Sequence, residues 1–500
     1  MKRISPWLGL ALILALVTNA PAIAGTAKIP DHPSKLKYGT LTFKVPDAAK
    51  YRHTLSNGIV VYVGEDHALP LIDISITVRA GAFLDDPAKP GVASFTGTMI
   101  RKGGTKNLNA ETFDEKADFL AAQISSFGGD TRSGASLNCT TQTLDKGLDL
   151  FFDMLEHPAF QQDRLDLEKD NTLEAMKQRN DDAGDILRRE WGWQMYGMDH
   201  FSTRRLTASQ LASISRDDLI AFHKKYWLPA NMILTVSGDV KTEDILAELE
   251  RRFGEWNAKG PAVPWPPAPP HAKPVPGVYY VEKDIPQGKV YIGHLTYRAK
   301  DWNDTDRFAL SVMNDILGGG GFTSRITNRV RSDEGLAYSA GSSFHVGRYW
   351  PGTFRIFFQS KSATVALAAK LGLEEIRRIQ DEPVTDEELE IAKASFIDTF
   401  PQSFESAARI VGTFAGDEYI GRPHSYWVKY RDRIGSVTAE DVQRVAKKFL
   451  HPDNVVFLIV GNWEAIAAGD ADHRASMKEF FDGKATRIPL RDPLTLEPLP

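Results

Sequence analysis

The stretch Leu317–Ser343 reads LGGGGFTSRITNRVRSDEGLAYSAGSS. Its four consecutive glycines, Gly318 to Gly321, predict a tight backbone turn that residues with side chains could not make. A short, arginine-rich helix is expected next, because Ile326 and Val330 are four residues apart and so share one helix face. Gly335 is a typical helix terminator, and a strand is expected directly after it. The stretch therefore predicts a turn, a helix and a strand in quick succession.

Two residues of this stretch, Arg331 and Tyr338, allow more than one interpretation. From the pattern alone, Arg331 neutralises the C-terminal end of a helix and Tyr338 is an ordinary strand aromatic. The glycine run is not a phosphate-binding loop, because it lacks the Gly-Lys-Ser/Thr ending that such a loop requires.

The stretch also resembles the second-half signature of the pitrilysin/insulinase family of zinc peptidases, which includes the mitochondrial processing peptidases. In that family an arginine and a tyrosine seven residues apart reach toward the zinc site and hold the substrate backbone. Arg331 and Tyr338 match this pair, and the surrounding Gly335-Leu336-Ala337-Tyr338 is intact. The resemblance implies that these two residues contact substrate.

Further along the chain, the second half repeats part of the first. Ser215–Gly238 (SRDDLIAFHKKYWLPANMILTVSG) aligns without gaps on Thr438–Gly461 (TAEDVQRVAKKFLHPDNVVFLIVG), at a constant offset of 223 residues. The shared positions are Asp218, Lys224, Lys225, Pro229, Asn231 and Gly238, which fall on Asp441, Lys447, Lys448, Pro452, Asn454 and Gly461. The constant offset favours a duplication over convergence of two helix–turn–strand segments. The paired lysines are interpreted as surface helix faces and not as catalytic groups.

A connector separates the two halves. Residues Gly260–Gly277 read GPAVPWPPAPPHAKPVPG, with eight prolines and almost no charge, which is typical of a stiff, extended linker. The 500 residues are too many for one ordinary core. The fold class we predict is α+β: two homologous domains, each a mostly antiparallel sheet packed with helices, joined by this proline-rich linker. The predicted divisions are a first domain at 49–256, a linker at 257–277, a second domain at 278–482 and a tail at 483–500.

Periodicity gives a coarse list of elements for the first domain. Strands are expected at Gly58–Val63, Leu71–Arg79, Ser136–Thr141 and Met232–Val236. Helices are expected near Gly91 and at Asn109–Gln123, Leu144–Leu155, Asp163–Arg189 (one long helix) and Ser215–Tyr226.

Active members of the family carry H-x-x-E-H on a first-domain helix, with two histidines as zinc ligands and the glutamate as general base. The matching segment here is Gly91–Met99, GVASFTGTM. Ser94 and Thr98 stand at the histidine positions and Gly97 stands at the glutamate position. Because these residues supply neither imidazole nor carboxylate, we predict that this chain binds no catalytic zinc and activates no water.

The family's third zinc ligand is a glutamate further along the chain, and its spacing reaches Glu174 or Ala175. Glu174 is either a surviving remnant or part of a solvated helix face, and the same two interpretations apply to Glu168. His200, His223 and His294 are predicted to be structural or surface histidines. Ser94 has no G-x-S-x-G context, so it is not predicted to be a serine nucleophile.

The first 24 residues predict a secretory signal peptide. Lys2 and Arg3 precede an apolar run, and Ala22-Ile23-Ala24 forms a small-residue cleavage site before Gly25. An uncleaved N-terminal anchor is the alternative. Residues 25–48 are expected to form a strap. The single cysteine, Cys139, cannot form an intramolecular disulfide, and export without disulfides suits a Gram-negative periplasm.

Charge and hydropathy exclude two classes of partner. Removing Lys2 and Arg3 takes the formal net charge from −5 to −7, which gives no electrostatic basis for binding nucleic acid. No later segment is long and apolar enough to cross a membrane, so no stable membrane insertion is expected.

Taken with these residues, the resemblance implies the non-zinc-binding subunit of a heterodimeric zinc peptidase. Arg331 and Tyr338 would act in trans on an unfolded peptide that lies at the zinc of a homologous, H-x-x-E-H-bearing subunit. The peptide would bind by extending a sheet edge. The competing hypothesis is a structural or peptide-binding pseudoenzyme, and a third is an autonomous peptidase with an unusual site. This chain is expected to bind no cofactor itself.

Overall fold

The computed structural model describes residues 30–32, 35–36, 42–254, 256, 263–269, 273–470 and 472–500. The predicted signal peptide lies outside the described residues, as do most of the predicted strap and part of the linker. The chain forms two compact units, Met1–Phe43 and Lys44–Pro500. In the first unit, Lys35 forms an ion pair with Asp31 at 2.7 Å. Everything below concerns Lys44–Pro500.

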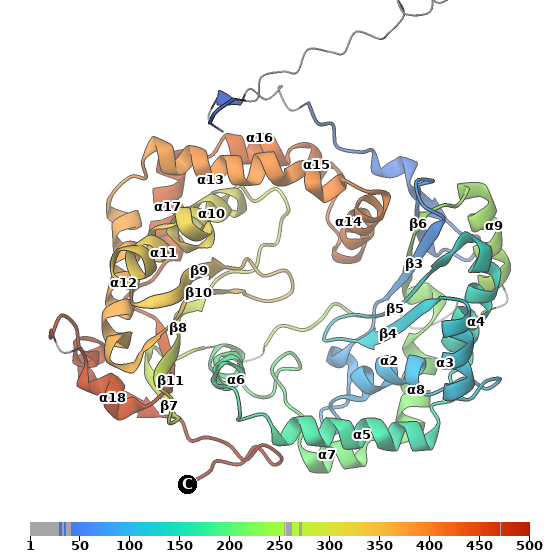
Figure 1. The fold of residues 1–500 in the computed structure, drawn as a ribbon, viewed down its shortest axis with the longest axis horizontal. Coiled ribbons are helices and arrows are strands. Elements are labelled where there is room, and N and C mark those ends of the chain that lie inside the picture. Colours follow the sequence, from blue (N-terminus) through green and yellow to red (C-terminus); the bar gives the residue numbers. More distant parts are fainter. Residues whose placement is uncertain are drawn as a thin grey trace, which may run out of the picture. The chain divides into compact units, whose positions relative to one another are not determined.

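Two six-stranded sheets organise this unit, one from each half of the chain (Figure 1). The first sheet has the order β1-β2-β6-β3-β5-β4 and the second has the order β12-β7-β11-β8-β10-β9. The first contains β1 (Arg52–Thr54), β2 (Val60–Glu65), β3 (Leu71–Val78), β4 (Gln123–Gly128), β5 (Ser133–Thr140) and β6 (Met232–Gly238). The second contains β7 (Gly277–Glu282), β8 (Gln287–Leu295), β9 (Ala337–Phe344), β10 (Thr353–Lys361), β11 (Val456–Gly461) and β12 (Ala485–Arg487).

The two sheets share one topology. Strands β2, β6, β3, β5 and β4 occupy the places that β7, β11, β8, β10 and β9 occupy in the second sheet. In both sheets the pairing is antiparallel except where β6 joins β2 and where β11 joins β7, and at the edge pair of β12 and β7. The predicted α+β class and the two homologous domains are therefore confirmed.

Helices from each half cover these sheets. The first half contributes α2 (Val92–Lys102), α3 (Ala110–Phe119), α4 (Leu144–Glu156), α5 (Gln162–Lys177), α6 (Ala183–Tyr196), α7 (Ala208–Ser213), α8 (Arg216–Tyr226) and α9 (Thr242–Phe253). The second contributes α10 (Asp306–Asn314), α11 (Arg325–Thr327), α12 (Val365–Asp381), α13 (Asp386–Thr399), α14 (Ala407–Ile420), α15 (Ser425–Val428), α16 (Tyr430–Gly435), α17 (Ala439–Phe449) and α18 (Trp463–Ala468). Around α11 the chain forms the short helical turns η6 (Asp315–Gly319), η7 (Gly321–Thr323) and η8 (Asn328–Asp333), of which η6 and η8 are π-helical.

The predicted single helix over Asp163–Arg189 is wrong. The chain breaks between α5 and α6, where the Asp182 side chain accepts the backbone N–H groups of Gly184 and Asp185. An aspartate in this N-cap position starts a new helix, and periodicity alone does not reveal it. The helix predicted from Asn109 ends at Phe119, and β4 follows, a strand that the sequence pattern did not indicate.

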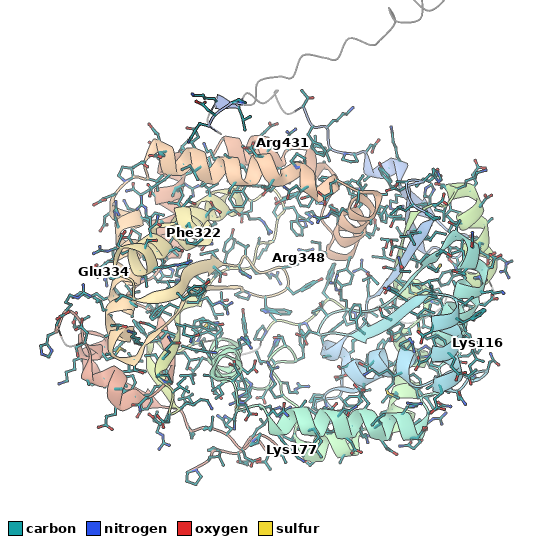
Figure 2. The ribbon with its side chains drawn as sticks, viewed as in Figure 1. Lys116, Lys177, Phe322, Glu334, Arg348 and Arg431 are labelled. Carbon is teal, nitrogen blue, oxygen red and sulfur yellow. The ribbon has the colours of Figure 1, made fainter. Side chains whose placement is uncertain are left out.

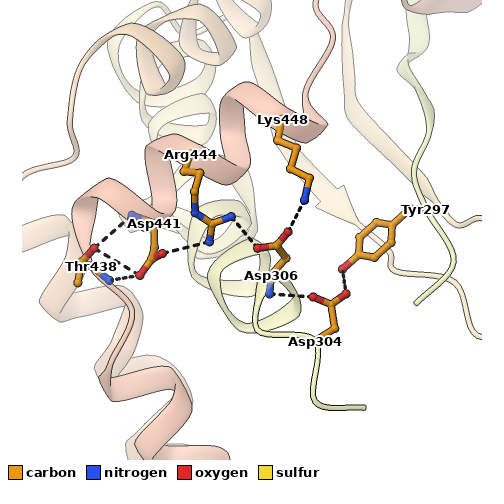
Figure 3. A network of polar contacts seen from close by, with 7 residues as sticks. All are labelled: Tyr297, Asp304, Asp306, Thr438, Asp441, Arg444 and Lys448. Atoms are coloured by element: carbon orange, nitrogen blue, oxygen red, sulfur yellow. Dashed lines mark hydrogen bonds and ion pairs between the residues drawn. The ribbon is translucent and has the colours of Figure 1, made fainter. Parts of the chain in front are cut away.

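The repeated segment folds the same way twice. In α8, Ser215 and Asp218 form a reciprocal capping box, and in α17 Thr438 and Asp441 form the same one. Figure 3 shows the second copy, in which Arg444 and Lys448 of α17 bind Asp306 at the start of α10, at 2.7 and 2.8 Å. Lys448 therefore connects two helices, which agrees with a structural role for the repeated lysines.

Each half contributes one helix to the other half's sheet. Helix α6 packs against β11 and β8 of the second sheet, and α14 packs against β6 and β2 of the first (Figure 1). The first contact buries Ile186 and Leu187 of α6 against Leu458 of β11. The two helices occupy equivalent places, since Ala407 lies 224 residues after Ala183 and both helices have 14 residues.

The residues predicted as a C-terminal tail take part in the structure. Strand β12 pairs in parallel with β7, and the carbonyl of Leu494 accepts the backbone N–H of Ala208 at 2.8 Å. The exact domain boundaries stay a prediction.

Burial of His223 makes stability depend on pH. Its Nε2 lies 2.8 Å from the carbonyl oxygen of Leu155, and burial lowers the pKa of the imidazole to about 4. The unfolded state, with a pKa of about 6.5, takes up the proton first, so this contribution is complete above pH ~6.5 and is lost as pH falls toward 4. For this residue we expect the free energy of unfolding to drop by about 2 kcal/mol between pH 7 and pH 5.

The measurement is urea denaturation at both pH values. His223→Gln should show a smaller drop between pH 7 and pH 5 than the native chain, whereas His473→Gln, at an exposed histidine, should show the native drop. Equal drops in all three proteins would contradict the assignment to His223.

Candidate functional site

Local structure around η8 places Arg331 and Tyr338 close together. Ile326 and Val330 are both fully buried and anchor the short helix to the second core. The helix ends at Gly335, whose φ of +64° lies in the left-handed region, and the backbone N–H of Gly335 donates to the carbonyl of Arg331. This confirms the predicted terminator, and β9 begins two residues later.

The Arg331 guanidinium lies against two aromatic rings. Its central carbon lies 4.4 Å from the centre of the Phe322 ring and 4.9 Å from that of the Tyr338 ring. Cation–π attraction of this kind fixes the plane of the guanidinium while leaving its edges open. Within the described part of the chain, the Arg331 side chain forms neither a hydrogen bond nor an ion pair, so its N–H donors are available. The Tyr338 side chain is 86% exposed.

Phe322 is a member of this site that the sequence analysis did not single out. It sits in η7, directly after the glycine run, and it is 66% exposed although it is large and apolar. Figure 2 labels it beside the helices of the second half. The signal that could have identified Phe322 from the sequence is its position immediately after Gly321, within the stretch Leu317–Ser343.

The glycines before Phe322 serve two purposes. Gly321 has a φ of +62°, which provides the predicted tight turn. Gly318 is needed for close packing, because a Cβ there would lie 2.4 Å from the backbone nitrogen of Ser342 in β9. The run therefore places η6 directly against the edge strand that carries Tyr338.

The degenerate zinc positions lie on α2 in the first half. The Asp85 carboxylate accepts the backbone N–H groups of Gly91 and Ala93, both at 2.8 Å, and so fixes the start of this helix. Burial raises the pKa of Asp85 to about 6. Ser94 and Thr98 face a cavity of about 310 Å³.

Gly97, at the general-base position, has no room for a side chain. A Cβ there would lie 2.1 Å from the backbone nitrogen of Gly128 in β4, and the Ser126 hydroxyl donates to the Gly97 carbonyl at 2.6 Å. Helix α2 therefore lies directly on the edge of the first sheet, as η6 lies on β9 in the second.

Both glutamates of α5 that the sequence singled out, Glu174 at the third-ligand position and Glu168, form ion pairs with lysines. Glu168 forms an ion pair with Lys102 of α2 at 2.8 Å, and Glu174 is exposed and binds Lys177 at 2.6 Å. Across the described ranges, no group of three or more His, Cys, Asp or Glu side chains is arranged to hold a metal ion. The donor set and the closed position at Gly97 do not fit the zinc centre that active members of the family contain.

Both halves of the chain match models of known protein families. The model described as "Insulinase (Peptidase family M16)" matches residues 60–206, and the model described as "Peptidase M16 inactive domain" matches residues 213–396. The chain belongs to the insulinase family, peptidase family M16. The resemblance drawn from Arg331, Tyr338 and the repeat is thereby confirmed.

Relatives in this family carry contrasting names. A Helicobacter pylori protein named "Non-peptidase homolog YmxG" is 26% identical over 412 residues, which cover 81% of this chain and 92% of that one. A Bacillus subtilis protein named "Uncharacterized zinc protease YmxG" is 23% identical over 411 residues, covering 82% and 97%. The two names differ on activity, although both proteins match this chain over most of its length.

Solved structures agree with the fold. An M16 inactive domain from Pseudomonas fluorescens matches with a TM-score of 0.72 at 25% identity, covering 82% of this chain and 97% of that one. The periplasmic protease PqqL from Escherichia coli matches with a TM-score of 0.68 at 15% identity, covering 92% of this chain and 51% of that one. This insulinase-family chain thus has the family fold without the family's metal ligands. Within the described residues, no helix is long and apolar enough to span a membrane.

Because the packing at Gly97 leaves no room for a methyl group, replacing this glycine with alanine should destabilise the fold unusually strongly. Gly97→Ala should lower the free energy of unfolding by about 2 kcal/mol or more, because the added methyl group meets backbone that cannot move aside easily. The matched control is Gly412→Ala in α14, where an added Cβ meets nothing within 4 Å. That change should be neutral or stabilise by up to about 1 kcal/mol.

Chemical denaturation of the two variants measures the difference. Similar stabilities for both would show that the first half has room at this position and would overturn the argument against a general base there.

Proposed function

We propose that this chain is the non-zinc-binding subunit of a periplasmic heterodimeric zinc peptidase. Arg331 and Tyr338 bind the substrate peptide and stabilise the transition state at the zinc of an H-x-x-E-H-bearing partner. The observation that carries the proposal is the state of Arg331. The rings of Phe322 and Tyr338 both lie within 5 Å of its central carbon, while its N–H donors have no partner among the described residues.

The chemistry of the two side chains suits this role. A guanidinium presents planar, forked donors that match a peptide carbonyl or the oxyanion that develops from it. The Tyr338 hydroxyl adds a second donor from a side chain that is almost fully exposed. Donors aimed at developing negative charge are worth most when they are fixed before the reaction begins, and the two rings fix Arg331. In this proposal the partner subunit supplies the zinc ion and the water that it activates.

Sheet edges support binding of an extended peptide. Strand β9 is the edge of the second sheet and carries Tyr338 at its second residue. A substrate segment that adds to this edge gains main-chain hydrogen bonds without requiring a particular sequence. The corresponding edge of the first sheet, β4, is packed by α2, whose Arg101 donates to the Ile124 carbonyl at 3.0 Å. Because η6 packs on β9 in a similar way, it is the position of Tyr338 on β9 that favours this strand as the peptide-binding edge.

The proposal also includes a periplasmic location for this chain. The N-terminal 24 residues have the pattern of a secretory signal peptide, with cleavage expected after Ala24. A periplasmic location is consistent with the name of the E. coli structural neighbour, although that likeness concerns the fold alone.

The main test uses co-expression with a candidate H-x-x-E-H partner encoded beside this chain. Zinc content and cleavage of a mixture of unstructured peptides are measured for the chain alone, for the pair, and for pairs carrying Arg331→Ala or Tyr338→Phe. We expect activity only in the pair. Arg331→Ala should lower kcat/KM by about 100-fold and Tyr338→Phe by about tenfold, because each removes a donor to the transition state.

Size-exclusion chromatography of the variants serves as the control, since assembly should be unchanged. Normal rates in both variants would leave a structural or peptide-binding pseudoenzyme, the competing hypothesis. Zinc-dependent cleavage by the chain alone would contradict the interpretation of Ser94, Gly97 and Thr98.

The contact of the Phe322 ring with Arg331 also predicts that Phe322 positions the guanidinium. Phe322→Ala should lower kcat/KM of the pair by roughly tenfold, because loss of one ring frees the Arg331 guanidinium to rotate. Phe322→Tyr should retain most of the activity, since it keeps the ring. Phe119→Ala, which removes an even more exposed phenylalanine from α3, is the matched control and should leave the rate unchanged. Equal rates for Phe322→Ala and Phe119→Ala would refute the positioning role.

A further inference from the structure

A second cavity, of about 310 Å³, lies away from Arg331 and from α2. Its lining comes from the linker, from the loop after β8 and from the loop between β9 and β10. The side chains that the argument uses are Trp265, Arg298, Lys300, Arg348 and Tyr349. Figure 2 labels Arg348 well apart from Phe322.

Three cations line this cavity and no carboxylate does. Arg298 donates to the carbonyl of Tyr349 at 3.2 Å, and Nε of Arg348 donates to the carbonyl of Ile420 at 2.9 Å. Among the residues described in the structure, none of the three cations has an acidic side chain within ion-pair distance, 4.0 Å. This is unusual for a chain with a formal net charge of −5.

The undescribed segments contain almost nothing that could neutralise the cavity. Outside the described ranges the sequence has one acidic residue, Glu255. The cations also repel one another: burial, and after it the neighbouring Arg298 and Arg307 guanidiniums, lower the pKa of Arg348. A cluster of like charges without a counter-ion is relieved when an anion binds.

A structural role accounts for only part of the cluster. Arg348 and Arg79 both donate to carbonyl groups in the last turn of α14, which stabilises the end of that helix. Arg298 and Lys300 are exposed and make no such contact with α14. Their presence beside Arg348 is left unexplained by helix capping.

Aromatic rings form one wall of the cavity. Trp265 is 55% exposed, and tryptophan is enriched at binding interfaces. Its ring lies 5.5 Å from that of Tyr349, and the guanidinium carbon of Arg348 lies 5.3 Å from its centre. The cavity therefore combines charge for an anion with ring surface for an adjoining apolar group.

We propose that this cavity, the Trp265–Arg298–Lys300–Arg348 site, binds an acidic side chain of the peptide substrate. A glutamate or aspartate would receive hydrogen bonds from Arg298 and Lys300, and the neighbouring side chain of the peptide would pack on Trp265. This inference rests on the proposed function, because it requires that the chain holds unfolded peptide. It adds a preference for acidic segments at a point distinct from Arg331 and Tyr338.

Peptide binding to the mature chain without a partner tests the site. Fluorescence anisotropy would compare two labelled, unstructured peptides that differ only in having glutamate or glutamine at several positions. We expect the glutamate peptide to bind about tenfold more tightly at low ionic strength, with the difference shrinking as salt is added. Arg298→Gln/Lys300→Gln should remove this difference and leave binding of the glutamine peptide unchanged.

The matched control is Lys116→Gln/Lys177→Gln, which removes the same charge from α3 and α5, where Figure 2 labels both lysines. It should retain the full preference. Equal binding of the two peptides by the native chain, or an equal effect of the two double variants, would overturn the site. Tighter binding of inorganic tripolyphosphate than of the glutamate peptide, measured by competition, would overturn its assignment to peptide.

These outcomes are separable from those of the main proposal. The binding measurement needs neither the partner nor Arg331 and Tyr338. A failure here therefore leaves catalysis in trans intact, and inactive Arg331 variants of the pair would leave the glutamate preference in place.

Discussion

The reciprocal packing of α6 and α14 is the constraint on which the rest of the structure depends. Strand β11 is buried along its whole length: Phe457 and Ile459 face the helices of their own half, and Val456, Leu458 and Val460 face α6 from the other half. Neither sheet can bury both faces with helices of its own half. The two homologous domains therefore complete each other's cores, and a sequence boundary at the linker does not separate two independent folding units.

Close glycine contacts decide what each half can do chemically. In the second half Gly318 brings η6 onto β9, and in the first half Gly97 brings α2 onto Gly128 of β4. The first half thus uses, for backbone packing, the position at which active family members carry a general base. Losing the zinc site here involves more than three changed side chains, because the space for the carboxylate is also gone. In both sheets a helical segment therefore packs closely on the edge strand.

What could be predicted from the sequence was local or repeated. The repeated segment that contains α8 and α17 and the Gly335 terminator follow from short patterns with fixed spacing, and the positions of Ser94, Gly97 and Thr98 follow from the family resemblance. The missed features depend on distant contacts. Asp182 starts a helix whose apolar face packs on β8 and on β11, the latter more than 250 residues further along the chain, so local periodicity merged α5 with α6. The role of Phe322 depends on its place beside Arg331 and Tyr338. Only the folded turn brings these three residues together.

The state of Arg331 favours the proposed binding role over a scaffolding one. A structural arginine in a folded protein normally donates to carbonyl oxygens or carboxylates, as Arg79 does at the end of α14 and Arg325 does with Glu388. Arg331 contacts two aromatic rings, and in the described structure its donors have no protein acceptor. These contacts require two aromatic side chains that remain exposed to solvent. A purely structural protein would gain nothing by keeping them. An oriented guanidinium with open donors, beside the edge strand of a sheet, is suited to a ligand with carbonyl or oxyanion oxygens.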